Sequence, residues 1–190
     1  DFLPPDRHAF KYDEVLIPTP PTPLSHPTLF TDPPMWVRNQ SNSRHGVEFA
    51  YYTGVNMKKY YRRYCEALLA VDDSVGRLLS NLEKSGELED TVVLYLGDNG
   101  FIFGEHGLID KRCAYDESIR IPMLMRYPKS LKPGTKVEKI VANIDVAPTL
   151  LEVAGLKSKK RMDGESFWQL AKVKGSSDWR KYLLYEYYWE

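Results

Sequence analysis

Cysteine is scarce in this sequence, and neither sign of charge is in excess. The chain of 190 residues has two cysteines, Cys65 and Cys113, and neither lies in a C-x-x-C pair or beside spaced histidines. Neither a disulfide framework nor a structural zinc site is therefore indicated. Lys and Arg together number 26, as do Asp and Glu, whereas nucleic-acid-binding proteins carry an excess of basic residues. We expect no nucleic-acid partner.

Long apolar runs are also absent. No stretch approaches the roughly 20 apolar residues of a transmembrane helix, so we expect no membrane span. The first residues, Asp1 to Asp6, lack the basic and then apolar layout of a signal peptide. Hydrophobic residues nevertheless make up 43% of the chain, which is enough to bury a core. The composition predicts a globular protein.

Proline is concentrated in the first 46 residues, including the run from Pro18 to Pro23. Because proline fixes φ and removes a backbone donor, this segment is predicted to be extended and irregular. A disordered linker is one interpretation. The apolar side chains interspersed among the prolines, such as Phe2, Phe10 and Leu16, favour docking on a surface instead.

A long helix and then a buried strand are predicted after this segment. From about Asn56 to Leu82 apolar residues recur at steps of three and four, and Gly86 can take the left-handed conformation that ends a helix. The run from Thr91 to Leu96 is nearly all apolar, as in a strand covered on both faces of a sheet. This succession is typical of α/β proteins. Further strands are predicted over residues 121–127, 138–142 and 182–188, and helices over 143–155, with Asp145 as N-cap, and 166–171.

Polar residues with possible chemistry follow the predicted strand. Asp98 and Asn99 lie at its carboxyl end, where open α/β sheets place ligand sites. Their carboxylate and carboxamide oxygens suit calcium or magnesium. An ordinary turn is the alternative, because Asp-Asn-Gly is a common turn sequence. The glycine-rich stretch that follows, with His106 and Lys111, favours the ligand site.

Several motifs around this point resemble one family. They are Thr91 to Gly100 (TVVLYLGDNG), Phe103 to Gly107 (FGEHG), Asp110-Lys111 and Tyr115 to Pro122 (YDESIRIP). Together they resemble the formylglycine-dependent sulfatases of the alkaline phosphatase superfamily, and the resemblance extends over most of the chain. It implies an α/β fold in which part of a mixed, mostly parallel sheet is flanked by helices, incomplete in this chain.

The resemblance also implies roles for individual residues. In the family a calcium ion is held by two acidic residues from an N-terminal strand and by a later pair, which Asp98 and Asn99 match; magnesium is the lesser alternative. Lys111 matches the lysine that contacts the substrate sulfate, which suits a compact ammonium group. His106 is a candidate substrate contact, with a structural hydrogen-bonding role as the alternative.

The family's nucleophile, a formylglycine made from the first residue of Cys/Ser-x-Pro-x-Arg, has no counterpart in these residues. The run from Ser25 to Leu29 is the nearest match, but it has leucine where arginine is needed. We therefore expect the nucleophile, the first metal ligands and a leaving-group histidine in an N-terminal remainder of the same protein. The chain alone is expected to be inactive.

The resemblance predicts a sulfatase that acts on a sulfated small molecule or glycan, in a parent protein that is periplasmic or secreted. A non-catalytic anion-binding relative and a phosphatase or phosphonate hydrolase of the same superfamily are the alternatives. We predict three parts of the chain: residues 1–46, packing on the catalytic domain; 47–175, the C-terminal part of that domain; and 176–190, the start of a further C-terminal subdomain.

Overall fold

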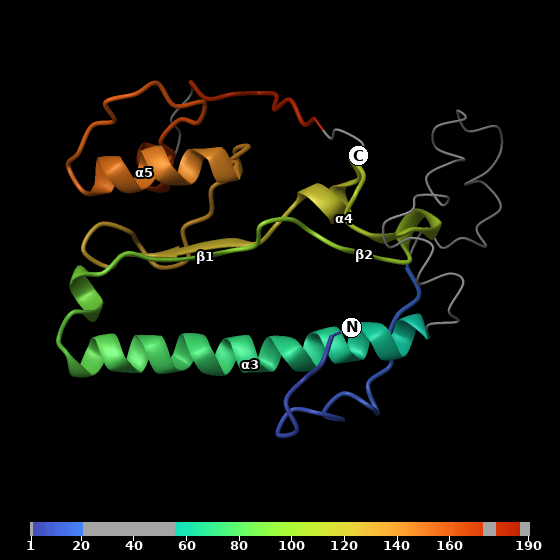
Figure 1. The fold of residues 1–190 in the computed structure, drawn as a ribbon. Coiled ribbons are helices and arrows are strands. Elements are labelled where there is room, and N and C mark those ends of the chain that lie inside the picture. The colour runs from blue at the N-terminus through green and yellow to red at the C-terminus, as the bar shows by residue number, and fades with distance from the viewer. Residues whose placement is uncertain (1, 21–55, 173–177, 187–190) are drawn as a thin grey trace. The chain divides into compact units, whose positions relative to one another are not determined.

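The computed structural model describes residues 2–20, 56–172 and 178–186 (Figure 1). It divides into two compact units. The first unit comprises Asp1–Gly86 and Asn99–Ile121, and the second comprises Glu87–Asp98 and Pro122–Glu190. The proline-rich stretch over residues 21–46 and the end of the predicted strand at 182–188 lie outside the described residues.

The long helix of the first unit confirms the sequence prediction. Helix α3 spans Met57–Lys84, and the Oδ1 atom of Asn56 caps its start by accepting a hydrogen bond from the Lys59 amide at 3.1 Å. Beyond its end Gly86 has φ of 73°, the left-handed conformation that was predicted. No helix in the described ranges is both long enough and apolar enough to span a bilayer.

The N-terminal segment of the first unit packs on α3, but it is not extended. Residues 6–15 form turns, with the His8 amide donating to the Pro5 carbonyl at 2.8 Å. The Tyr12 amide contacts the Glu66 carboxylate at 3.3 Å, and only 3% of Glu66 is exposed. The helical pattern places Glu66 among the polar residues, which are expected to be exposed. Its burial differs from that expectation because the turns of residues 6–15 cover it.

The apolar residues of this segment do not all dock on the described part of the chain. Phe2 contacts the rings of Tyr60 and Tyr64, with centroids 4.8 and 5.0 Å apart. Phe10 and Leu16 are instead 76% and 86% exposed. Phe2 therefore docks on α3 within this chain, whereas docking of Phe10 and Leu16 stays a prediction, and its surface would lie outside the described residues.

Asp73 on α3 makes two of the polar contacts that hold this segment. Its Oδ2 atom lies 2.8 Å from Nε2 of His8 and 2.9 Å from Nε of Arg7. The hydrogen bond to His8, and then that to Arg7, lowers the pKa of the Asp73 carboxyl below its ordinary value of 3.8. A carboxyl whose pKa is lower in the folded state stabilises that state above its ordinary pKa, and this stabilisation is lost as the pH falls through the folded-state value.

We therefore expect residues 6–15 to detach from α3 in acid, at pH below about 3.8. After division by the intrinsic exchange rate at each pH, the protection of the amides of residues 8–15 should fall there. Asp73→Asn should exchange fast already near neutral pH and lose the pH dependence, while Asp72→Asn, at an exposed position, should behave as the unsubstituted protein. Unchanged exchange in Asp73→Asn would contradict the assigned anchor.

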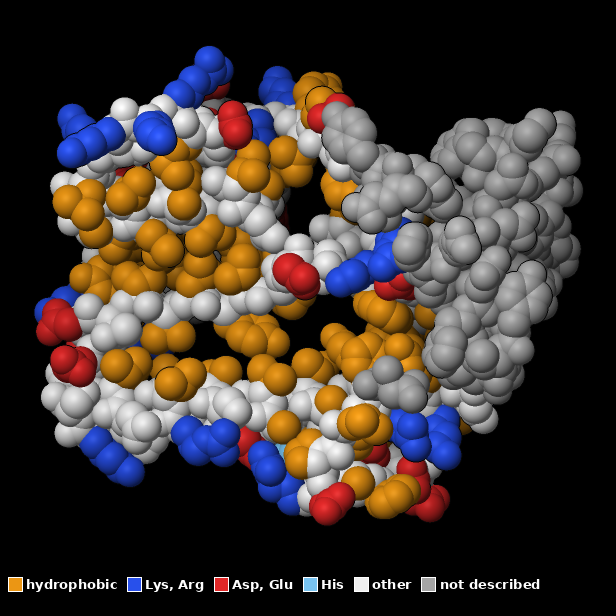
Figure 2. All heavy atoms as spheres, in the orientation of Figure 1, with side chains coloured by type: hydrophobic (Ala, Val, Ile, Leu, Met, Phe, Trp, Pro, Cys, Tyr) orange, Lys and Arg blue, Asp and Glu red, His pale blue; other side chains and the backbone are white. Residues whose placement is uncertain are grey.

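The second unit is built on a short strand pair. Strand β1, Val93–Leu96, pairs antiparallel with β4, Met123–Arg126, and Leu96 lies opposite Met123. Helices α5, Val146–Val153, and α6, Trp168–Lys172, complete the unit. Figures 1 and 2 show α5 over one face of the pair, with apolar side chains between them. The buried core residues of this unit are Phe167, Trp168, Leu170 and Ala171.

Both strand pairs of the described residues are antiparallel. Antiparallel pairs are part of the mixed sheet that was expected, and the parallel pairs of that sheet stay a prediction. After β1 the chain makes a hairpin and a short helix and then returns beside β1 in the opposite direction, without the long crossover that a parallel pair needs. All four residues of β1 are half-buried, and α5 covers one face of the strand pair (Figure 1).

Other boundaries also shift. Residues 138–142, expected as a strand, form a loop, and residues 182–186 are not in a strand either. The helix expected over 143–155 begins as a turn of 3-10 helix, Asn143–Asp145, before α5. Strand β4 lies within the strand predicted over residues 121–127, and α6 confirms the short helix predicted over residues 166–171.

Asp145 joins three segments of the second unit. Its side chain is fully buried and accepts hydrogen bonds from the amides of Ala142 and Glu165, both at 2.8 Å, and from Nη2 of Arg180 at 2.6 Å. Asp145 does precede α5, but its carboxylate does not cap the amides of that helix. The predicted N-cap role is replaced by a cross-link between distant segments of the chain.

Candidate functional site

A hairpin carries the predicted site residues of the first unit. Strand β2, Ile102–Phe103, pairs antiparallel with β3, Ile109–Asp110, and Ile102 lies opposite Asp110. Lys111 follows β3, so the hairpin returns it toward the end at which β2 begins, close in register to Gly100 and Asn99. Ile102 is fully buried, and Leu108 and Ile109 are nearly so. The hairpin is therefore anchored by its apolar side chains.

Ser118 connects the two ends of this hairpin. It lies in helix α4, Asp116–Ile119, and is only 1% exposed. Its backbone carbonyl accepts a hydrogen bond from the Gly100 amide at 2.7 Å, and its hydroxyl donates to the backbone carbonyl of Lys111. One residue thus holds both the turn after Asn99 and the lysine. Sequence reasoning missed Ser118, although it stands within the Tyr115 to Pro122 motif.

Gly100 is required by the close approach of α4 to this turn. A Cβ atom at this position would overlap the backbone carbonyl of Glu117 and lie 2.9 Å from the carbonyl oxygen of Arg120. These are backbone atoms of a hydrogen-bonded turn, which cannot move aside as a flexible side chain can. Only glycine fits there without displacing α4.

Gly100→Ala is therefore expected to destabilise the protein by about 2–3 kcal/mol, as overpacking does. The matched control is Gly76→Ala on α3, where a Cβ atom would meet nothing within 4 Å and should stabilise by about 0.5–1 kcal/mol through helix propensity. Urea denaturation of both variants of the whole protein measures the difference. Equal effects of the two substitutions would show that α4 does not press on the turn.

Lys111 lies beside a partly buried carboxyl group. Burial raises the pKa of Asp110, and the charge of Lys111 opposes this rise. Nε of Arg112 lies 3.5 Å from the Asp110 carboxylate, and Asp110 has φ of 85°, a strained conformation for a residue other than glycine. Strain of this kind is concentrated at functional sites. The half-buried Lys111 thus lies in a cluster of charged side chains with Asp110 and Arg112. A lysine in such a cluster can bind an anion.

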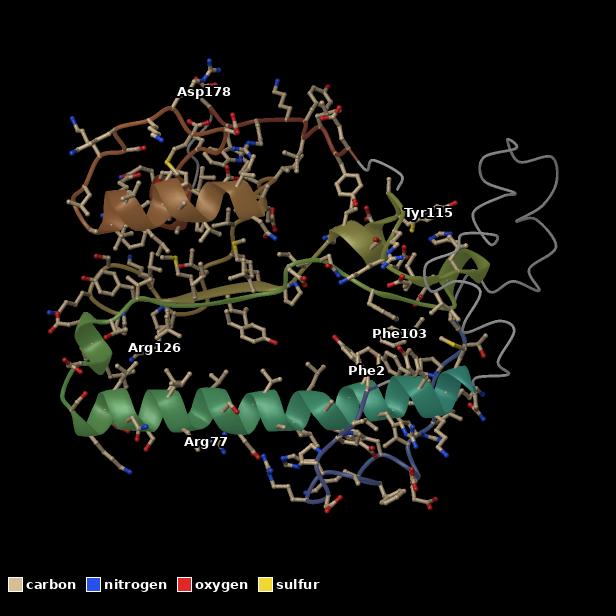
Figure 3. The ribbon with its side chains drawn as sticks, viewed as in Figure 1. Phe2, Arg77, Phe103, Tyr115, Arg126 and Asp178 are labelled. Atoms are coloured by element: carbon tan, nitrogen blue, oxygen red, sulfur yellow. The ribbon has the colours of Figure 1, made fainter. Side chains whose placement is uncertain are left out.

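His106 occupies the tip of the hairpin. Its φ is 54°, its ring stacks on that of Tyr115 with centroids 3.9 Å apart and planes at 10°, and its Nε2 atom lies 3.1 Å from the Glu117 carboxylate. Figure 3 shows Tyr115 on the loop that leads into α4. His106 is therefore held by the same α4 segment that holds Lys111. Its role as a substrate contact stays a prediction.

The predicted metal ligands Asp98 and Asn99 are neighbours in sequence, and the division between the two units falls between them. Asp98 is exposed at the end of one segment of the second unit, and Asn99 is half-buried at the start of a segment of the first. The backbone carbonyl of Asp98 accepts a hydrogen bond from Asn143 at 3.0 Å. Nδ2 of Asn99 donates to the Gly100 carbonyl at 2.7 Å, and Oδ1 is the one oxygen of this side chain that a cation can contact.

This donor set fits part of a calcium site. Calcium takes six to eight oxygen ligands, and Asp98 and Asn99 offer carboxylate and carboxamide oxygens. Within residues 2–20, 56–172 and 178–186 no three acidic, histidine or cysteine side chains gather as metal ligands. The two residues are thus compatible with the predicted half-site and need further ligands from elsewhere.

A cluster of aromatic side chains follows the turn in sequence and packs on α3. Phe101 and Phe103 follow Gly100, and their ring centroids are 4.6 Å apart. Phe103 also contacts Tyr61 and Tyr64 of α3 at 4.9 and 5.0 Å, and Phe2 lies 5.7 Å from Phe101 (Figure 3). The rings connect the site to the long helix and to the N-terminal segment.

Neither cysteine has the lowered pKa of an activated thiol. Burial raises the pKa of both the Cys65 and the Cys113 thiols, and both are free cysteines. A raised pKa keeps a thiol protonated at neutral pH, and the reactive form is the thiolate. This agrees with their lack of the family's nucleophile motif.

Comparisons with known proteins relate the chain to sulfatases. The family model described as N-sulphoglucosamine sulphohydrolase, C-terminal, matches residues 104–190. The N-acetylglucosamine-6-O-sulfatase of Bacteroides thetaiotaomicron is 44% identical over 133 residues, which are 69% of this chain and 24% of that protein. The chain therefore spans about a quarter of the length of this curated relative.

Two solved structures share the fold. One, in complex with its substrate D-glucosamine-2-N,6-O-disulfate, has a TM-score of 0.76 and 29% identity, over 98% of this chain and 49% of that one. The phosphonate monoester hydrolase of Silicibacter pomeroyi has a TM-score of 0.75 and 22% identity, over 94% of this chain and 37% of that one. At that identity the second likeness concerns the fold alone.

The chain has part of the α/β fold of the alkaline phosphatase superfamily, as predicted. Within that class the chain is similar to the C-terminal part of sulfatases.

Proposed function

We propose that the parent protein is a calcium-dependent sulfatase that removes sulfate esters from sulfated glycans, with 6-O-sulfated glucosamine units as the favoured group. The observation that carries the proposal is the arrangement around Ser118, which holds the turn after Asn99 and the backbone of Lys111 with one buried residue. The substrate class is supported by the N-acetylglucosamine-6-O-sulfatase relative and by the structural neighbour bound to a sulfated glucosamine.

In this proposal each residue has a distinct task. Asp98 and Asn99 supply two oxygen donors to the calcium ion, which would polarise sulfate oxygens as a Lewis acid. The ammonium group of Lys111 binds a sulfate oxygen and stabilises negative charge that develops as the ester bond breaks. His106 contacts a sugar hydroxyl, oriented by its stacking on Tyr115.

The nucleophile is assigned to the N-terminal remainder, as a formylglycine. The three predicted parts of the chain, 1–46, 47–175 and 176–190, also stay proposals. Within the second unit, residues 178–186 are tied to the rest by the Arg180–Asp145 pair and by the Trp179 indole, which donates to the Ile140 carbonyl at 2.7 Å.

The test uses the whole protein, which is this chain together with its N-terminal remainder. The nucleophile residue of that remainder is converted to formylglycine, and the protein is loaded with calcium. We expect hydrolysis of N-acetylglucosamine 6-sulfate and of an aryl sulfate, and calorimetry should show that Asp98→Ala weakens calcium binding by tenfold or more, in the range of 10–100-fold found for metal-site losses. Asp163→Ala, at another exposed acid, is the control. A modified protein that binds calcium and hydrolyses no sulfate ester would refute the proposal.

A further inference from the structure

A basic loop follows helix α5, at the end opposite to Asn143 and its contact with Asp98. Gly155, with φ of 69°, ends the helix, and the Leu156 amide donates to the Leu151 carbonyl at 2.8 Å. The chain then reaches four exposed basic residues within five positions: Lys157, Lys159, Lys160 and Arg161. Figure 2 shows basic side chains gathered at the part of the second unit where this loop lies in Figure 1.

The loop is folded by a residue that is not charged. The Ser158 hydroxyl donates to the Lys160 carbonyl at 2.6 Å and accepts from the Lys160 amide at 3.2 Å. Both contacts use the backbone of Lys160, so the basic side chains contribute nothing to them. Their charges are therefore not needed to hold the loop.

The four basic residues outnumber the acids of this loop, where Asp163 is exposed two positions after Arg161. The whole chain has a formal net charge of zero, yet none of the four basic side chains forms an ion pair within the described part of the chain. The acid nearest along α5, Glu152, is hydrogen-bonded to Gln169 at 2.7 Å. Four like charges held in one loop without partners suit a polyanion.

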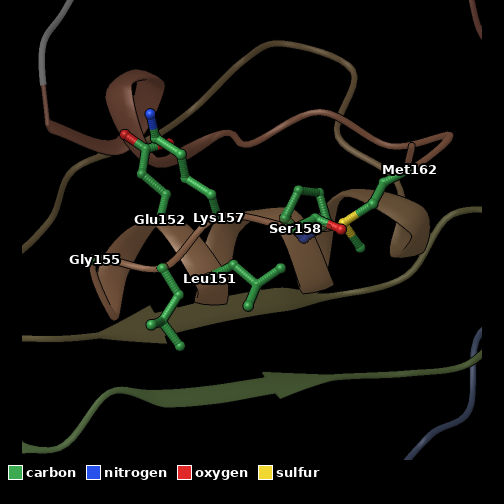
Figure 4. Close-up of a pocket in the computed structure, with 8 residues that line it drawn as sticks. Leu151, Glu152, Gly155, Lys157, Ser158 and Met162 are labelled. Atoms are coloured by element: carbon green, nitrogen blue, oxygen red, sulfur yellow. The ribbon is translucent and has the colours of Figure 1, made fainter. Parts of the chain in front are cut away.

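An apolar hollow lies directly beneath the basic loop. Its volume is about 390 Å³, and its lining is mostly apolar: Pro148, Leu151, Leu156 and Met162, with Glu152, Lys157 and Ser158 at its rim (Figure 4). Leu156 is 60% exposed. A sulfated sugar presents both kinds of surface, because its ring has an apolar C–H face and its sulfates are anionic. The apolar hollow suits the C–H face of the sugar ring, and the basic loop suits its sulfates.

We propose that this hollow and basic loop form a second binding site, for an internal segment of a sulfated polysaccharide. Asn143, just before α5, contacts the carbonyls of Gly97 and Asp98, whereas the loop follows the other end of α5. The eight residues of α5 separate the two by about 12 Å of helix. The site thus contacts sugars other than the one that reacts. The inference rests on the proposed function, since it assumes a polymeric form of that substrate.

The test compares two triple variants of the whole protein in a binding assay with immobilised heparin. K159S/K160S/R161S removes three charges of the loop. The matched control K132S/K136S/K139S removes three exposed lysines from another loop of the second unit. At about 0.15 M salt the first variant should bind about tenfold more weakly or worse. Its log affinity should also fall less steeply with log salt, by about one unit for each basic side chain that no longer meets a sulfate.

The control should bind within about twofold of the unsubstituted protein, and both variants should hydrolyse N-acetylglucosamine 6-sulfate at the unsubstituted rate. Equal losses of heparin binding in both variants, or none in either, would overturn the proposal. So would equally tight binding of polyphosphate, which would show attraction to any polyanion. An unsubstituted protein that binds heparin through the loop but hydrolyses no sulfate ester would refute the proposed function and leave the binding site standing.

Discussion

Lys111→Ala in the whole enzyme is expected to lower kcat/KM for a sulfate ester by about 10²–10³-fold, the usual loss when one stabilising donor is removed from developing negative charge. The backbone of Lys111 is held by Ser118 whatever the side chain, so the fold should survive the substitution. Steady-state kinetics with N-acetylglucosamine 6-sulfate and an aryl sulfate measure the effect. The loss should be similar for both substrates, because both carry the sulfate that Lys111 is proposed to contact.

Lys132→Ala, at an exposed lysine of the second unit, is the control and should leave kcat/KM unchanged. Lys111→Arg separates charge from shape: a guanidinium group keeps the charge but not the compact ammonium geometry, so we expect partial activity. If Lys111→Ala kept nearly full activity on both substrates, the lysine would not contact the sulfate.

Asp145→Ala is expected to give the largest loss of stability, about 3–5 kcal/mol, the usual cost of removing one partner of a buried ion pair. The substitution leaves Arg180, whose side chain is only 17% exposed, without its carboxylate. It also leaves the amides of Ala142 and Glu165 without their acceptor. Urea denaturation of the whole protein should show the loss in the transition that includes the second unit.

Asp163→Ala removes an exposed carboxylate close in sequence to Glu165 and should change the free energy of unfolding by less than about 0.5 kcal/mol. A small effect of Asp145→Ala, comparable with that control, would mean that the three segments are held together by apolar packing instead.

The elements that follow from local patterns were predictable. The apolar periodicity, Asn56 and Gly86 define α3 and both of its ends, because caps and periodicity act within a few residues. Strand β1 was predictable for the same reason, as an apolar run that ends in a short polar motif, and the site residues after it stay predictions. Asp98, Asn99 and Lys111 need the resemblance to acquire roles, since each is an ordinary turn or surface residue by composition.

The features that depend on distant partners were not predictable. Glu66 has the sequence environment of a solvent-exposed helix residue, and only the turns that cover it bury it. Asp145 sits where an N-cap should, but its partners come from residues before it and from Glu165 and Arg180. The direction in which β4 pairs with β1 likewise depends on the path of the chain between them. Periodicity and composition contain no information on such contacts.

The contacts of Ser118 also determine which part of the site can vary. Because α4 holds Gly100 and Lys111 directly, the spacing between the turn and the lysine is set by α4 and not by the length of the hairpin that joins them in sequence. The tip of the hairpin, where His106 lies, could then differ in length or composition while the backbone of Lys111 stays in place. Recognition of the sugar and recognition of the sulfate would in that way be separable within one short stretch of chain.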